Sequence, residues 1–183
     1  MLLLVGGESL LPLSSRAQGV AEEDRPCIEA TAVTPSESAF DVLLRSASCT
    51  NKEKYEAAAR LLQVGNAFQH YDVQRIRDTT QHDAFKEWMG KTFRFYPQDE
   101  RKAVLREMRR LAQSAEARAP ICEHLRSMGP PTYTPKYMIK YGRRLKDVPD
   151  EENIEMPPPP EDFEASSAWA AARAYVSCST TDE

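Results

Sequence analysis

Residues 51–89 read NKEKYEAAARLLQVGNAFQHYDVQRIRDTTQHDAFKEWM and carry the most regular apolar pattern in the chain. Apolar residues recur there at intervals of three and four, which places them on one face of an α-helix. The first set is Tyr55, Ala58, Ala59 and Leu62, and the second is Phe68, Tyr71, Ile76, Phe85, Trp88 and Met89. The spacing predicts a helical centre around which the remaining helices pack.

Helix ends are marked by glycine, proline and capping residues. Gly65 predicts the end of a helix over 51–64, because glycine tolerates the left-handed conformation in which helices stop. Further helices are predicted over 34–50, 66–77, 80–94, 98–117, 119–129 and 134–142, with a short last one over 169–176. The fold class predicted from this pattern is all-α, a compact bundle of about six or seven short helices over residues 20–145.

Residues 54–67, KYEAAARLLQVGNA, resemble one helix of a tetratricopeptide or Sel1-type repeat. In such repeats a tyrosine and small alanines allow close packing of helices. No second copy follows at the period of about 34 residues that these arrays require. The resemblance therefore implies helix-on-helix packing and identifies no family.

The last 38 residues differ in composition from the rest of the chain. Residues 146–183 contain ten carboxylates and two cations, a net charge of −8, which leaves +4 on residues 1–145. A run of four prolines, Pro157–Pro160, lies in the same segment. An acidic, proline-rich composition predicts a disordered tail, which ends in a short helix that carries Trp169.

The first nineteen residues, MLLLVGGESLLPLSSRAQG, resemble an export signal. Leucines form an apolar region, and Ser15 and Ala17 supply the small residues that a signal peptidase requires. Glu8 interrupts the apolar region and no basic residue precedes it, as in a truncated signal. The segment predicts a periplasmic or secreted protein. A mitochondrial presequence is the alternative, although Arg16 is its only basic residue. No apolar run reaches the roughly 18 residues that span a bilayer.

Four cysteines support an oxidising compartment, because an even number is compatible with two disulfides. Cys27 and Cys49 bracket one predicted helix and are the favoured pair. Cys122 and Cys178 would then remain, and a bond between them would clamp the tail to the body. The alternative is free cysteines, with Cys122 buried as a small apolar residue.

Catalytic and metal-binding motifs are not evident. His70, Asp72 and His82 form the nearest candidate cluster, but two metal-binding histidines on one helix require a spacing of four. No nucleophile elbow or glycine-rich phosphate loop occurs. The sequence thus predicts no catalytic residue, metal ligand or cofactor.

A basic stripe is predicted on the helix over 98–117. It consists of Lys102, Arg106, Arg109 and Arg110. Nucleic acid is disfavoured as its partner, because the same helix carries Glu100 and Glu107 and the whole protein is acidic. A solvated face, or a contact for the acidic tail, is the favoured interpretation.

A tyrosine-rich segment, PPTYTPKYMIKYG at residues 130–142, is the predicted partner-binding surface. Tyrosine and methionine are favoured at protein interfaces, although the same residues could close the end of the bundle. The candidate contact residues are Tyr133, Tyr137, Met138, Tyr141 and Trp169.

These observations favour a non-enzymatic exported protein that binds another protein, such as an inhibitor or immunity-type protein. The alternative is an accessory subunit of a larger membrane-associated complex, bacterial or mitochondrial. A third hypothesis, an enzyme or metal protein that uses His70, Asp72 and His82, is less favoured. The sequence leaves the oligomeric state open.

Overall fold

The computed structural model describes residues 25–145 and 155–178, and in these ranges the chain is all-helical without a strand. The predicted fold class is confirmed. The α-helices are α1 (Ala39–Asn51), α2 (Tyr55–Arg75), α3 (Ala84–Arg94), α4 (Gln98–Gln113), α5 (Ala115–Met128), α6 (Lys136–Leu145) and α7 (Ala165–Tyr175), with short 3-10 turns η2 (Ala30–Ala32) and η3 (Thr79–Gln81). The predicted export signal and residues 146–154 of the predicted tail lie outside the described residues.

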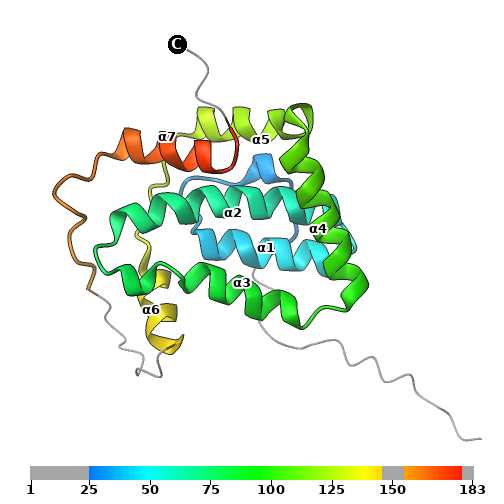
Figure 1. Ribbon diagram of the computed structural model, residues 1–183, viewed down its shortest axis with the longest axis horizontal. Helices are drawn as coiled ribbons and strands as arrows, with labels where there is room; N and C mark the ends of the chain where they lie inside the picture. The colour runs from blue at the N-terminus through cyan, green and yellow to red at the C-terminus, as the bar shows by residue number, and fades with distance from the viewer. Residues whose placement is uncertain (1–24, 146–154, 179–183) are drawn as a thin grey trace, which may run out of the picture.

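Helix α2 is the centre of the bundle (Figure 1). Helix α1 runs beside it, and α4 and α7 pack against it from other sides. The buried residues of α2 come from both predicted apolar sets and include Ala58, Leu62, Phe68 and Tyr71. The stretch that was predicted to organise the fold therefore does so.

The predicted helix end at Gly65 is wrong, because α2 continues through it to Arg75. A Cβ atom at position 65 would lie 3.3 Å from Cζ of Phe85 and 3.6 Å from Cγ1 of Val42. Glycine is needed here so that α1 and α3 can approach α2 closely. A glycine that stops a helix and a glycine that permits close packing look the same in a sequence.

Substitution of Gly65 by valine is expected to destabilise the protein by about 1–3 kcal/mol, because overpacking displaces the Phe85 and Val42 side chains. Gly90 is the matched control, since a Cβ there meets nothing within 4 Å. Gly90→Ala is expected to stabilise α3 by up to about 1 kcal/mol through helix propensity. Urea denaturation of both variants measures the two changes. Similar effects of the two substitutions would contradict the close-packing role of Gly65.

Two helix boundaries differ from the prediction because serine caps compete with the predicted ends. Helix α1 begins at Ala39 rather than Thr34, since Ser38 and Asp41 form the capping box. The predicted helix over 98–117 is divided at Ser114, whose Oγ accepts a hydrogen bond from the backbone N–H of Ala117 at 3.1 Å and caps α5. Capping hydroxyls satisfy N–H groups that the helix leaves free.

Two disulfides close the bundle. One joins Cys27, before η2, to Cys49 near the end of α1, which is the pair favoured from the sequence. The other joins Cys122 in α5 to Cys178, three residues beyond α7. All cysteines of the chain are thus paired. Two disulfides fit an oxidising compartment such as the periplasm or the extracellular space.

The described part of the tail packs onto the body. Helix α7 begins at Ala165, four residues before the predicted start, because the Glu164 side chain caps it. Trp169 is 4% exposed, and its ring lies 6.0 Å from the ring of Phe68 and 5.9 Å from that of Tyr71, centroid to centroid. The tail helix therefore completes the core beside α2 (Figure 1).

Candidate functional site

The residues predicted to contact a partner lie mostly in the interior. Tyr137 is 8% exposed, Trp169 4%, and Met138 is fully buried. Tyr133 is half-buried with its hydroxyl turned inward, and the side chain of Tyr141 is outside the described residues. The partner-binding prediction is wrong for Tyr137, Met138 and Trp169, because these side chains fill the core.

A buried carboxylate explains why the tyrosines point inward. Asp72 of α2 is fully buried, and its Oδ2 accepts hydrogen bonds from the hydroxyls of Tyr133 at 2.6 Å and Tyr137 at 2.8 Å. Its Oδ1 pairs with the guanidinium of Arg75, which also donates to the backbone carbonyl of Tyr133 at 2.9 Å. We call Asp72, Arg75, Tyr133 and Tyr137 the Asp72 network. It fixes α6 and the segment before it to α2.

Burial and the neighbouring groups determine the protonation states in the Asp72 network. Desolvation raises the pKa of Asp72 above its usual value, and the Arg75 charge and the two tyrosine donors oppose that rise. Desolvation and the carboxylate of Asp72 hold the pKa values of Tyr133 and Tyr137 well above 10. Both tyrosines therefore stay protonated and act as donors. The carboxylate of Asp72 and both tyrosine hydroxyls are hydrogen-bonded, whereas Nε of Arg75 is buried without a partner. The network is a structural element of the core.

The histidines of the candidate cluster have separate structural partners. Nε2 of His82 lies 2.8 Å from the backbone carbonyl oxygen of Ile76. The ring of His70 stacks on Tyr175 of α7 with centroids 4.4 Å apart, and its Nδ1 lies 3.3 Å from Nε2 of Gln74. Within the described ranges no three His, Cys, Asp or Glu residues are grouped as metal ligands.

Acidification is expected to weaken the fold through His70, since burial lowers the pKa of this imidazole. The unfolded chain then takes up the proton first, so stability declines as the pH falls below about 6.5 and is fully present above it. Urea denaturation between neutral and mildly acidic pH should show this decline, and it should be smaller for His70→Gln. An equal decline in the variant would exclude His70 as its source.

A polar groove of about 700 Å³ lies where α2 begins, beside α4. Its lining residues are Glu29, Glu53, Lys54, Tyr55, Glu56, Ala57, Arg60 and Glu107. They come from the segment before η2, the α1–α2 loop, the first turns of α2 and one side of α4. Sequence reasoning missed this groove, because its carboxylates come from three separate segments of the chain and follow no motif.

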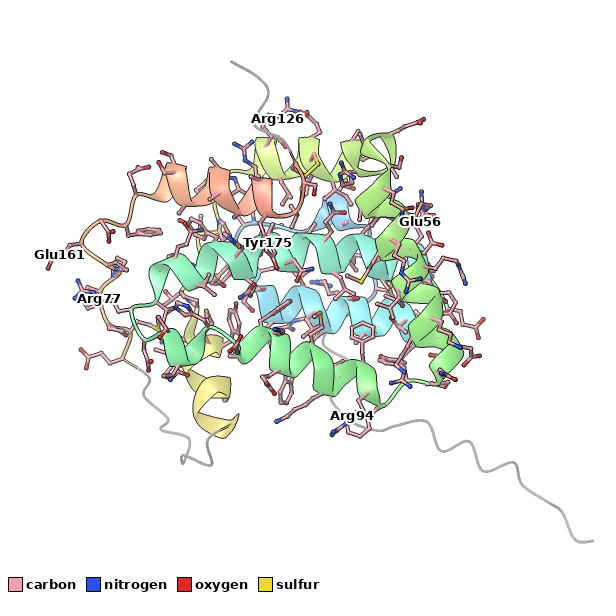
Figure 2. All side chains as sticks on the ribbon, viewed as in Figure 1. Glu56, Arg77, Arg94, Arg126, Glu161 and Tyr175 are labelled. Carbon is pink, nitrogen blue, oxygen red and sulfur yellow. A yellow bond between two sulfur atoms is a disulfide. The ribbon has the colours of Figure 1, made fainter. Side chains whose placement is uncertain are left out.

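Ion pairs hold the side chains in place on one wall of the groove. Oε1 of Glu56 accepts from Nη2 of Arg60 at 2.8 Å and from Nη2 of Arg110 at 2.7 Å, and these hydrogen bonds lower the pKa of Glu56. Figure 2 shows Glu56 at the edge of the molecule next to α4. Desolvation and the charge of Glu100 raise the pKa of Tyr55, which therefore remains a neutral donor.

Glu53, which also lines the groove, has a left-handed backbone conformation. Its φ is 58°, in a region that a residue with a side chain rarely adopts. This conformation costs about 1–2 kcal/mol relative to the usual regions. The residue follows the C-terminal cap of α1, and the N–H of Lys54 donates to the carbonyl oxygen of Cys49 at 2.9 Å, a common way for a helix to end. The candidate functional site is the groove itself, a hollow lined by charged side chains.

Sequence and structure comparisons assign no relative. No protein-family model, curated protein or solved structure matches this chain.

Proposed function

We propose that the protein is a non-enzymatic exported protein that binds another protein, and that the groove at the start of α2 receives a basic segment of this partner. An inhibitor or immunity-type protein has this character. The single observation that carries the proposal is the groove itself, a hollow with four glutamates on its walls.

Export is supported by the two disulfides. All four cysteines form disulfides. Each bond joins segments that are distant in the chain, with sequence separations of 22 and 56. Such bonds persist in the periplasm or outside the cell and are rare in reducing compartments. No helix in the described part of the chain is long and apolar enough to cross a membrane.

A binding role is supported over catalysis by the surroundings of the reactive side chains. The rings of His70 and His82 have partners within the bundle, and the buried carboxylate of Asp72 binds Arg75 and two tyrosine hydroxyls. Catalysis requires a nucleophile or base within reach of a substrate. The groove offers carboxylates, two cations and a tyrosine, which are the components of a polar protein interface.

The charge of the groove supports a basic partner. The lining contains four carboxylates and two cations, Lys54 and Arg60, so carboxylates are in excess. Glu56 and Glu107 already bind Arg110, whereas no ion pair involves Glu29 or Glu53 among the described residues. A lysine- or arginine-rich loop would neutralise this excess. Charge complementarity of this kind accelerates association and gives specificity.

The test is an affinity capture with the full chain as bait, from the extracellular or periplasmic fraction of its natural source. Glu53→Gly removes a groove carboxylate and relieves the left-handed strain, so stability should be unchanged or rise by up to about 1 kcal/mol. Glu29→Lys adds a cation to the same groove. We expect both variants to lose a stoichiometric partner that the original chain retains.

Ser177→Gly is the matched control. Ser177 has a φ of 60°, so this change relieves the same backbone strain at a position beyond α7 that does not line the groove. The control should retain the partner. Capture of the same partner by both groove variants, or failure of the original chain to capture any protein in stoichiometric amount, would contradict the proposal.

A further inference from the structure

The side of α4 that faces away from the core combines an exposed leucine with cations. Leu105 is 48% exposed, although it is a large apolar residue. Lys102 precedes it by three positions and Arg109 follows it by four, so both flank it on the helix surface. We call the exposed residues Lys102, Leu105, Arg106 and Arg109 the basic face of α4.

The cations of this face are largely free of internal partners. No carboxylate lies within 4 Å of Lys102 or Arg109 among the described residues, and Arg106 is 3.9 Å from Glu107. The half-buried Glu107 instead pairs with Arg110 on the groove side of α4. The described part of the acidic tail packs on α2 and α5. Within residues 25–145 and 155–178, therefore, no acidic segment covers the basic face of α4.

The turn between α3 and α4 also combines an exposed apolar side chain with a cation. Phe95 is 66% exposed, and the guanidinium of Arg94 lies over its ring at 5.7 Å from the centroid. Residues 84–113 carry eight cations and four carboxylates, a net charge of +4. Residues 155–178 carry a net charge of −3. Figure 2 shows Arg94 and Glu161 well apart, on different sides of the bundle.

We infer that α4 and the α3–α4 turn form a peripheral binding surface for a lipid bilayer with anionic headgroups. Lys102, Arg106 and Arg109 would contact the headgroups, while Leu105 and Phe95 insert their side chains just below them. The positive charge of residues 84–113 and the negative charge of residues 155–178 would orient α4 toward a negatively charged surface. This inference goes beyond the proposed function and uses a different side of α4.

A bilayer fits the surface better than an acidic protein does. Protein interfaces have an apolar centre from which lysine is depleted. Here each exposed apolar side chain stands singly, with Lys102 and Arg109 beside Leu105 and Arg94 beside Phe95. Anionic headgroups attract each nearby lysine and arginine, and leucine and phenylalanine side chains are apolar anchors of proteins that bind at a membrane interface.

The test is sedimentation of the full chain with vesicles. One set contains phosphatidylcholine alone, and the other contains about one third phosphatidylglycerol, which attracts nearby Lys and Arg side chains. We expect binding to the anionic vesicles alone and a loss of binding as salt is raised. The affinity of the Lys102→Glu/Arg109→Glu variant for these vesicles should fall by at least roughly tenfold. Leu105→Ser should bind several-fold more weakly.

Matched variants separate a local surface from net charge and general hydrophobicity. Arg77→Glu/Arg126→Glu makes the same change in net charge at the other sides of the bundle (Figure 2). Tyr175→Ser removes another exposed apolar side chain, 60% exposed. Both controls should bind anionic vesicles as the original chain does. Circular dichroism and thermal unfolding establish that all four variants are folded.

Several outcomes would overturn the inference. These are the absence of binding to anionic vesicles at low salt, equal binding to phosphatidylcholine alone, and equal weakening by the control variants. Capture of fluorescent polyglutamate through Lys102 and Arg109, without vesicle binding, would assign the surface to an acidic polypeptide instead. The capture test of the groove uses other residues and a protein partner, so each proposal fails independently.

Discussion

Replacement of Asp72 by alanine is expected to lower the free energy of unfolding by about 3–5 kcal/mol, because one partner of a buried ion pair is removed. Arg75 then loses its carboxylate, and the hydroxyls of Tyr133 and Tyr137 lose their acceptor. The midpoint of thermal unfolding should fall by roughly 10 °C. Urea denaturation followed by circular dichroism measures the change.

Two control variants separate the contributions within the Asp72 network. Tyr137→Phe removes one donor and leaves the ion pair, so it should cost only about 1 kcal/mol. Asp72→Asn keeps the shape but leaves Arg75 without a counter-charge, and it should be nearly as destabilising as alanine. A loss below about 1 kcal/mol for Asp72→Ala would show that the network contributes no more than an exposed pair.

Loss of the disulfide between Cys122 and Cys178 is expected to have an effect of similar size. The bond closes a loop with a sequence separation of 56, for which the chain-entropy estimate is about 4 kcal/mol. The Cys122→Ser/Cys178→Ser variant should release α7 and expose Trp169. The measurements are the free energy of unfolding and the emission maximum of the tryptophans, which should shift to longer wavelength.

The other disulfide provides the control for α7. The bond from Cys27 to Cys49 has a separation of 22, so its removal should cost about 3 kcal/mol. It lies away from Trp169, and under native conditions the emission of the Cys27→Ser/Cys49→Ser variant should stay unchanged. Equal spectral shifts in the two variants would contradict a local clamp on α7.

The sequence predicted the fold where the information was local. The apolar intervals of α2 follow from helical geometry, and the pair formed by Cys27 and Cys49 was favoured because these residues bracket one helix. Gly65 was misinterpreted, because its reason lies in Phe85 and Val42. These residues belong to other helices, and no local pattern indicates that they meet at this position.

The sequence predicted the candidate site poorly, because contacts between distant segments determine which polar residues remain exposed. Tyr133 and Tyr137 have the composition of an interface, but their acceptor Asp72 lies more than 60 positions earlier in the chain. Glu29 and Glu107 meet only after the bundle has formed. A tyrosine-rich segment could therefore not be assigned to the surface or the interior from its composition.

The basic stripe was predicted from spacing, and the structure separates it into two parts. Arg110 joins Glu56 and Glu107 on the groove side, whereas Lys102 and Arg109 remain beside Leu105. Spacing thus grouped Lys102 and Arg109 correctly but placed Arg110 with them. It did not reveal the exposed leucine as a companion of the cations, because Leu105 reads as one more apolar residue of an amphipathic helix.

The central claim is that two disulfides close one helical body, with the tail helix as part of it, in an oxidising compartment. The direct measurement is mass-spectrometric mapping of peptides from the alkylated, unreduced protein isolated from its natural source. The account predicts linked peptides for Cys27 with Cys49 and for Cys122 with Cys178, and no alkylated cysteine. Alkylation of all four cysteines, or a different pairing, would contradict it.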